Sequence, residues 1–307
     1  MDPFSQLIGQ PQAVELLTQA AVKQRIAPAY LFVGPDGVGK SLAAKCFVEL
    51  LFNAHQNRIR QGNHPDLLWV EPTYQHQGQR LTSKEAQEKG LKRKAPPAIR
   101  LEQIRQIIEF LSRPPLEASR KIVVLEQAET MAEAAANALL KTLEEPGRAT
   151  LILIAPTPES VLPTIVSRCQ RIPFYRLSNG AMAEVLTKTG HKDILQYPAV
   201  FSVASGSPGD AIASYQQLQA IPEEILQAVT KFPSSYREAL ELAKQIDKNL
   251  DTEAQLWLVD YLQQFYWEQW RQPSIIQQLE QARKSLLSYA QPRLVWECMF
   301  LSLCNSY

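Results

Sequence analysis

The segment GPDGVGKS, Gly34 to Ser41, limits the possible folds of this chain more than any other segment does. It matches the pattern G-x-x-x-x-G-K-[S/T], follows the apolar run AYLFV, and precedes a helical pattern from Leu42 to Phe52. Between a strand and a helix, glycines let the loop curl so that backbone N–H groups point inward at the positive helix end. The segment therefore predicts a phosphate-binding loop.

Each part of this loop has an expected role. Backbone N–H groups would cradle phosphate oxygens, Lys40 would reach the β and γ phosphates, and the Ser41 hydroxyl would hold Mg²⁺. We therefore expect ATP with Mg²⁺ as the cofactor. The predicted nucleotide-binding residues are Gly34, Pro35, Asp36, Gly37, Val38, Gly39, Lys40 and Ser41.

Strand and helix patterns alternate on both sides of the loop, which predicts an α/β domain with a parallel sheet and crossover helices. After Phe174 the strand pattern disappears, and helical patterns continue to the end of the chain. The predicted helices are 10–24, 42–52, 99–112 and 134–145, and the predicted buried strands are 29–34, 121–126 and 150–155.

Two other segments have a distinct character. Residues 73–97 are polar and mixed in charge, with Lys92, Arg93 and Lys94 in succession, so we expect a long loop or surface insert. Aromatic residues recur at helical spacing between Trp257 and Trp267. Because no Lys or Arg alternates with them, they predict core or subunit interface and not a platform for stacking bases.

Composition excludes several classes of protein. The 32 Lys and Arg residues against 31 Asp and Glu give a net charge of +1, which indicates neither a nucleic-acid nor a membrane partner. No apolar run approaches the roughly 18 residues of a membrane span, and the N-terminal sequence lacks a secretory pattern, so we expect a cytoplasmic protein. The four cysteines have no metal-ligand spacing and are expected to pack as small apolar residues.

A nucleotide hydrolase with such a loop needs a carboxylate at the end of a neighbouring strand for Mg²⁺, and usually a Glu beside it to polarise water. Here that strand ends in VVLEQAE, which places Glu126 at the Mg²⁺ position and Gln127 at the catalytic position. Gln cannot accept a proton, so the pair predicts nucleotide binding with weak or absent hydrolysis. Glu129 is an alternative base, expected about one turn beyond the strand end.

Several longer segments together resemble one protein family. They are LEQIRQIIEFLSRPPLEASRKIVVLEQAETM, AANALLKTLEEP and VLPTIVSRCQRIPF. The chain is similar to the delta prime family of bacterial DNA polymerase III clamp-loader subunits, which are AAA+ proteins. The similarity extends from FSQLIGQPQAVELL to SYAQPRLVWECMFLSL, and LLKTLEEP and SRC are shared with the gamma/tau motor subunits. The insert after Glu71 and parts of the region after Ile221 have no counterpart.

The resemblance implies an α/β P-loop AAA+ domain over residues 1–173, a helical lid over 174–213 and a helical collar over 214–307. It also implies delta and gamma/tau subunits as partners in a hetero-pentamer, which acts on a sliding clamp and primed DNA. Arg105, on the helix from 99 to 112, either faces DNA in that ring or is simply solvated.

The resemblance also implies roles for single residues. Arg168 of SRC would enter the ATP site of a neighbouring subunit as an arginine finger, although a helix-end Arg can instead pair with a local carboxylate. Thr157 is the candidate sensor of the γ phosphate. The lid position where motor subunits carry Arg is Gly209, and the stretch that carries zinc ligands in relatives contains no cysteine here, so no zinc is expected.

Three hypotheses follow. The first is a stator that binds ATP weakly or without hydrolysis and supplies Arg168 to a neighbour. The second is an active ATPase of the gamma/tau type, although the chain ends at Tyr307 without the long extension of a tau form. The third is a scaffold with a vestigial P-loop. No carboxylate cluster indicates a polymerase site.

Overall fold

The computed structural model describes residues 3–52, 58–59, 63–76, 78–88, 96–231, 233, 235–288 and 290–304. The chain divides into two compact units, Met1–Ala181 and Met182–Tyr307. The expected boundary between a lid and a collar at residue 213 falls inside the second unit and stays a prediction. None of the described helices is long and apolar enough to cross a membrane.

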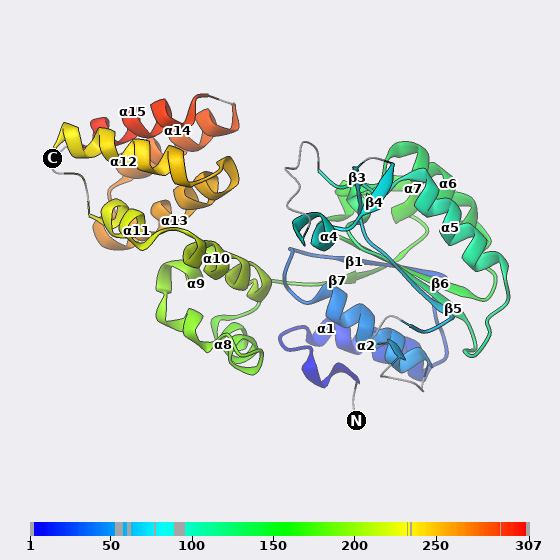
Figure 1. Cartoon of the computed structure of the whole chain (residues 1–307). Coiled ribbons are helices and arrows are strands. Elements are labelled where there is room, and N and C mark those ends of the chain that lie inside the picture. Colours follow the sequence, from blue (N-terminus) through cyan, green and yellow to red (C-terminus); the bar gives the residue numbers. More distant parts are fainter. Residues whose placement is uncertain are drawn as a thin grey trace. The chain divides into compact units, whose positions relative to one another are not determined.

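A five-stranded sheet forms the centre of the first unit, with the strand order β2-β5-β6-β1-β7 (Figure 1). Every pair of neighbouring strands in it is parallel, which confirms the predicted sheet. The strands are β1 (Ala29–Val33), β2 (Leu67–Val70), β5 (Lys121–Leu125), β6 (Ala149–Ala155) and β7 (Gln170–Pro173).

Helices cover both faces of this sheet, with α1 and α2 on one side and α5 and α6 on the other (Figure 1). The central strands are therefore buried on both faces, as parallel strands usually are. On β1, Leu31 packs into the cluster formed with α5 and α6, whereas Tyr30 contacts Phe47 of α2 edge to face. The helices are α1 (Pro11–Val22), α2 (Lys40–Phe52), α5 (Leu101–Ser112), α6 (Glu133–Glu144) and α7 (Pro163–Val166).

The sequence patterns predicted the central strands β1, β5 and β6 but not the outer strands. Both outer strands are only partly buried, with exposed residues in β7 and half-buried residues in β2. Because an edge strand is covered on fewer sides, its sequence lacks the continuous apolar run that marks a central strand.

The segment 73–97 is more regular than the loop or insert expected there. Its described part contains an antiparallel hairpin of β3 (Tyr74–His76) and β4 (Gln79–Leu81), followed by the short helix α4 (Ser83–Glu88). Of the two alternatives expected here, a loop is wrong for these residues, because a three-residue polar strand leaves too little periodicity to recognise. A surface insert stays a prediction. Lys92, Arg93 and Lys94 lie outside the described residues.

The second unit is helical throughout its described residues, as predicted. Trp296 and Phe300 of α15 are fully buried in its core, and the Trp296 indole donates a hydrogen bond of 2.8 Å to buried Gln255. Its helices are α8 (Asn179–Lys188), which begins in the first unit, α9 (Pro198–Val203), α10 (Pro208–Ala220), α11 (Glu223–Thr230), α12 (Tyr236–Asn249), α13 (Thr252–Trp270), α14 (Pro273–Leu287) and α15 (Pro292–Cys304).

Two sequence expectations concern this unit. The aromatic residues of α13 contribute to its core, where Tyr261 and Tyr266 are buried, while Trp267 is exposed. The expectation that all cysteines are packed is wrong for Cys298, which is exposed. On α15 the inward positions belong to Trp296, Met299 and Phe300, so residue 298 falls on the outer face.

Candidate nucleotide-binding site and surface arginine

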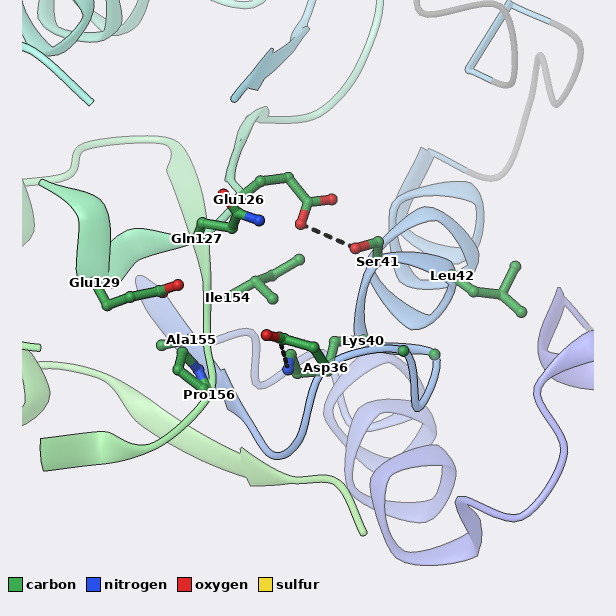
Figure 2. A pocket seen from close by; sticks show the side chains of 12 residues that line it. Asp36, Lys40, Ser41, Leu42, Glu126, Gln127, Glu129, Ile154, Ala155 and Pro156 are labelled. Atoms are coloured by element: carbon green, nitrogen blue, oxygen red, sulfur yellow. Dashed lines mark hydrogen bonds and ion pairs between the residues drawn. The ribbon is translucent and has the colours of Figure 1, made fainter. Parts of the chain in front are cut away.

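The predicted phosphate-binding loop borders a cavity of about 340 Å³ at the carboxyl ends of β1, β5 and β6 (Figure 2). In open parallel sheets, ligands bind at this edge. Among the predicted residues, the structure brings together the loop and the end of β5. The residues that line the cavity are Asp36, Gly37, Gly39, Lys40, Ser41, Leu42, Glu126, Gln127, Glu129, Ile154, Ala155 and Pro156.

The loop between β1 and α2 depends on its glycines. A Cβ atom on Gly34 would lie 2.3 Å from the Phe174 carbonyl oxygen, which is far inside contact distance. Gly37 and Gly39 have φ angles of 70° and 100°, which disfavour any residue with a side chain. The first glycine therefore allows β1 to pass close to the residue after β7, and the other two allow the loop to curl.

Lys40 is nearly buried and is held by the loop itself. Its ammonium group donates to the Gly34 carbonyl and, at 2.7 Å, to the Pro35 carbonyl, and it pairs with Asp36 at 3.1 Å. These contacts place the charge inside the curl of the loop. Phosphate oxygens would have to replace some of these acceptors when a nucleotide binds.

Ser41 and Glu126 meet across the cavity. The Ser41 hydroxyl donates a hydrogen bond of 2.9 Å to Glu126 Oε2, as Figure 2 shows. Burial raises the pKa of Glu126, the nearby Glu71 carboxylate raises it further, and the bond from Ser41 acts in the opposite direction. The Ser41 hydroxyl and the Glu126 carboxylate together offer oxygen ligands to a hard divalent cation. Such a cation would also stabilise the charged form of the buried Glu126.

These two oxygens fit the expected Mg²⁺. Among the described residues, no group of three His, Cys, Asp or Glu side chains could hold a metal. Mg²⁺ commonly uses only one or two protein carboxylates and takes its other ligands from phosphates and water. Ser41 and Glu126 would therefore hold the ion, which would neutralise phosphate charge when bound.

The chain turns sharply after β5. Gln127 has a left-handed backbone conformation, with φ 49° and ψ 54°, and leads into the 3₁₀ turn η2 (Ala128–Thr130). Within this turn, Glu129 lies in the lining of the same cavity. Figure 2 shows its carboxylate pointing toward the cavity.

The Glu129 carboxyl group is only partly satisfied in this position. Its Oε2 atom is buried without a hydrogen-bond partner among the described residues. Burial raises the pKa of Glu129, and the carboxylates of Asp36 and Glu126 raise it further, while a hydrogen bond from its own backbone and the charge of Lys40 lower it. The carboxylate is therefore within electrostatic range of the groups expected to surround a γ phosphate.

The candidate sensor Thr157 lies beyond the cavity. The lining ends at Pro156, and Thr157 is exposed at the start of the 3₁₀ turn η3 (Pro158–Ser160). Pro156 has neither an N–H nor a polar side chain to offer to a phosphate. The position next to Ala155 is therefore apolar in this chain.

Arg168 lies outside the lining of this cavity and directly follows the short helix α7 and Ser167. It pairs with Glu144 at 2.6 Å, and its side chain retains 37% of its accessible surface. This is the local carboxylate contact that the sequence left open as the alternative to a finger. Glu144 was not identified from the sequence, because nothing in LLKTLEEP shows which of its two glutamates contacts Arg168.

Gln10 is a further residue that sequence patterns missed. Its buried amide donates to the carbonyl oxygens of Val38, in the loop, and of Tyr175, at 3.2 and 2.7 Å. The Tyr175 N–H donates back to Gln10 Oε1 at 3.1 Å. One side chain thus connects the phosphate-binding loop with the segment that follows β7.

Comparison with known families decides the identity. A family model described as DNA polymerase III, delta subunit, matches residues 9–178, which is more than half of the chain. The chain belongs to this DNA polymerase III clamp-loader family. A second model, described as the C-terminal domain of cyanobacterial DNA polymerase III delta prime, matches residues 180–303. The two matches identify it as a delta prime relative and meet close to the boundary between its two units.

Curated relatives agree with this assignment. A DNA polymerase III subunit delta' from Bacillus subtilis is 36% identical over 58% of this chain and 51% of its own length. The subunit delta' from Pseudomonas aeruginosa is 34% identical over 52% and 46%, respectively. The tau subunit from Bacillus subtilis is 27% identical over 73% of this chain and 39% of its own. The chain spans about half of the length of the two delta' relatives and 39% of the tau subunit.

The fold of this chain is similar to that of a solved structure. It is a DNA polymerase III gamma subunit-related protein from Thermotoga maritima, with a TM-score of 0.58. The sequence identity is 18%, and the similarity covers 96% of this chain and 99% of that one. The chain therefore shares the fold of that protein, with an α/β unit followed by helices.

Proposed function

We propose that this chain is a clamp-loader subunit of the DNA polymerase III holoenzyme that supplies Arg168 to the ATP site of a neighbouring subunit. The observation that carries the proposal is the position of Arg168 on the surface of the nucleotide-binding unit, away from the cavity of its own chain. A guanidinium placed against a γ phosphate stabilises the charge of the transition state and is worth ~10³ to 10⁵ in rate.

The chain's own site supports binding more than hydrolysis. Lys40, Ser41 and Glu126 are placed to hold Mg²⁺ and phosphates. The neutral Gln127 occupies the position of the catalytic Glu, and the apolar Pro156 directly follows β6, where a polar sensor is expected. We therefore propose that ATP binds weakly or without turnover, and that the subunit acts as a stator.

The partners follow from this role. The proposal places the chain with delta and gamma/tau subunits in a hetero-pentamer in the cytoplasm. That assembly would open a sliding clamp and release it on primed DNA. The helical second unit would serve as lid and collar.

One observation favours a second candidate, an active ATPase of the gamma/tau type. Glu129 lines the cavity, its pKa is raised, and one of its oxygens has no partner among the described residues. These are properties of a general base that could activate water in place of Gln127. Its distance from an attacking water depends on how the nucleotide binds.

The test of the finger is ATP hydrolysis by the reconstituted loader in the presence of clamp and primed DNA. Arg168→Ala is expected to lower the rate at the one ATP site that Arg168 serves by about 10³-fold, so that the loader loses the contribution of this site to kcat. Arg168→Lys should restore little, because Lys lacks the planar donor fork. Arg171→Ala, an exposed arginine three positions away, is the matched control and should retain activity. Undiminished hydrolysis by Arg168→Ala would exclude the finger.

The test of the chain's own site uses the isolated protein. We expect it to bind a non-hydrolysable ATP analogue, to lose this binding on Lys40→Ala, and to release no phosphate from ATP. Steady phosphate release that disappears in Glu129→Gln would instead support the active ATPase. Absence of any nucleotide binding would support the scaffold with a vestigial P-loop.

A further inference from the structure

Only some of the N–H donors of the Arg168 guanidinium make hydrogen bonds to the described residues of its own chain. Nη2 donates to Glu144 Oε1 at 2.6 Å, and Nη1 donates to the Thr164 carbonyl at 2.9 Å and to Ser167 Oγ at 3.4 Å. A guanidinium has five N–H donors. The N–H of Nε and one N–H of Nη2 therefore have no partner among the residues that the structure describes.

The anchoring groups are themselves fixed to the core. Glu144 is the last residue of α6 and follows Leu143, which is 4% exposed. Thr164 lies in α7 next to Ile165, which is fully buried. Leu143 and Ile165 belong to one hydrophobic cluster, so the carboxylate and the carbonyl are held by two helices that pack together.

From this geometry we infer that Glu144 is a positioning residue for Arg168, holding the guanidinium so that two N–H donors face outward toward an anion on another subunit. The inference rests on the proposed finger role of Arg168. The ligand class is a nucleotide polyphosphate, because two N–H groups on adjacent nitrogens match two oxygens of one phosphate.

The physical basis is pre-organisation. A free Arg side chain has many rotamers, and part of this entropy is lost when the side chain is fixed against a phosphate. Glu144 and Thr164 restrict the side chain before the neighbour binds, so less freedom is lost on contact. An ion pair of two half-exposed groups contributes little to fold stability, which separates this role from a structural one.

The alternative is that the ion pair with Glu144 sequesters Arg168. If the pair sequesters Arg168, the guanidinium must leave Glu144 before it can reach a phosphate. Removal of the Glu144 charge would then raise the rate of hydrolysis by the neighbour. The sign of the change therefore distinguishes positioning from sequestration.

The chain offers a matched control at the next residue. Glu145 is exposed and has no hydrogen bond or ion pair with Arg168. Glu144→Gln and Glu145→Gln remove the same charge from adjacent surface positions, and only the first disrupts the anchor. Size-exclusion chromatography of both reconstituted loaders verifies that each variant assembles.

The experiment measures kcat and KM for ATP hydrolysis by the reconstituted loader with clamp and primed DNA. Glu144→Gln should lower the contribution to kcat of the ATP site that Arg168 serves about 10-fold, with little change in KM, whereas Glu145→Gln should match the wild type. In the Arg168→Ala background, Glu144→Gln should cause no further loss, because its effect passes through Arg168. A merely structural role would persist in that background.

Three results would overturn the inference, and they are distinguishable. Equal kcat for Glu144→Gln and Glu145→Gln, with Arg168→Ala still defective, removes the role of Glu144 and leaves the finger. A higher kcat for Glu144→Gln replaces positioning by sequestration. Full activity of Arg168→Ala removes the finger itself, and with it any positioning by Glu144.

Discussion

Ser41 and Glu126 are 85 positions apart in the chain, yet the Ser41 hydroxyl donates a 2.9 Å hydrogen bond to the Glu126 carboxylate. Ser41 lies in the first turn of α2, after the phosphate-binding loop, and Glu126 follows the central strand β5. Their contact brings a hydroxyl and a carboxylate to the same edge of the sheet. Burial opposes the charge on Glu126, and a cation would relieve this opposition.

The first prediction concerns the dependence of nucleotide binding on Mg²⁺. Glu126→Gln should weaken nucleotide binding about 10-fold in the presence of Mg²⁺, the lower end of the range for losing a supporting group at a metal site. In EDTA the variant and the wild type should bind alike. Titration of a fluorescent ATP analogue in both buffers measures this. An equal loss in EDTA would mean that Glu126 supports the loop and not the ion.

The second prediction concerns Gln10. Gln10→Ala removes an amide that makes three buried or part-buried hydrogen bonds and leaves backbone groups of Val38 and Tyr175 unpaired. We expect a loss of about 2–4 kcal/mol in the free energy of unfolding, measured by urea denaturation. Nucleotide affinity should also fall, because Val38 belongs to the loop.

Gln12 provides the control for this prediction, since it is exposed in the first turn of α1, two positions after Gln10. Gln12→Ala should change stability by less than about 0.5 kcal/mol. If both variants unfold alike, the Gln10 hydrogen bonds do not stabilise the first unit. If only stability changes, the loop keeps its shape without Gln10.

Local patterns predicted the strand, loop and helix of the nucleotide site, because all three are continuous in sequence around Gly34–Ser41. They also located the end of β5, where Glu126 and Gln127 follow a run of buried residues. The position of Glu129 was not predictable in the same way. It depends on the left-handed backbone conformation of Gln127, which the residue type does not predict.

Contacts between distant segments were beyond such patterns. Gln10 and Tyr175 are 165 positions apart, and Glu144 and Arg168 are 24 apart on different elements. Helical periodicity identifies the face that a residue occupies but not the atom that it meets. The exposure of Cys298 shows the converse, since residue type predicted burial and helical position on α15 decided otherwise.

The third prediction is a pH dependence that arises from Asp66. Burial alone would raise the pKa of its carboxyl group, but backbone N–H groups of Ala118, Glu117 and Leu116 donate to it at 2.7–2.8 Å and hold the pKa below its usual value. The folded pKa therefore lies below the unfolded value of about 3.9. The stabilisation is present above that value and is lost as pH falls through the folded pKa.

Asp66→Asn should therefore lower the free energy of unfolding at pH 7 by about 2–4 kcal/mol. The difference from the wild type should shrink as the pH falls below about 4. Urea denaturation at pH 7 and pH 3 measures both values. The exposed Glu159→Gln serves as control and should track the wild type at each pH. A difference that stays constant with pH would mean that the charge of Asp66 does not stabilise the segment 116–118.

The fourth prediction tests the close approach at Gly34. An alanine Cβ at this position would lie 2.3 Å from the Phe174 carbonyl oxygen, and backbone on both sides limits relaxation. Gly34→Ala should therefore destabilise the first unit and abolish nucleotide binding, because the loop cannot curl without displacing the residue after β7. Gly180→Ala is the control, since no atom lies within 4 Å of its added Cβ and the position is helical. Calorimetry with a non-hydrolysable ATP analogue and thermal unfolding should separate the two variants clearly. Nucleotide binding by Gly34→Ala at wild-type affinity would show that the loop can form without this glycine.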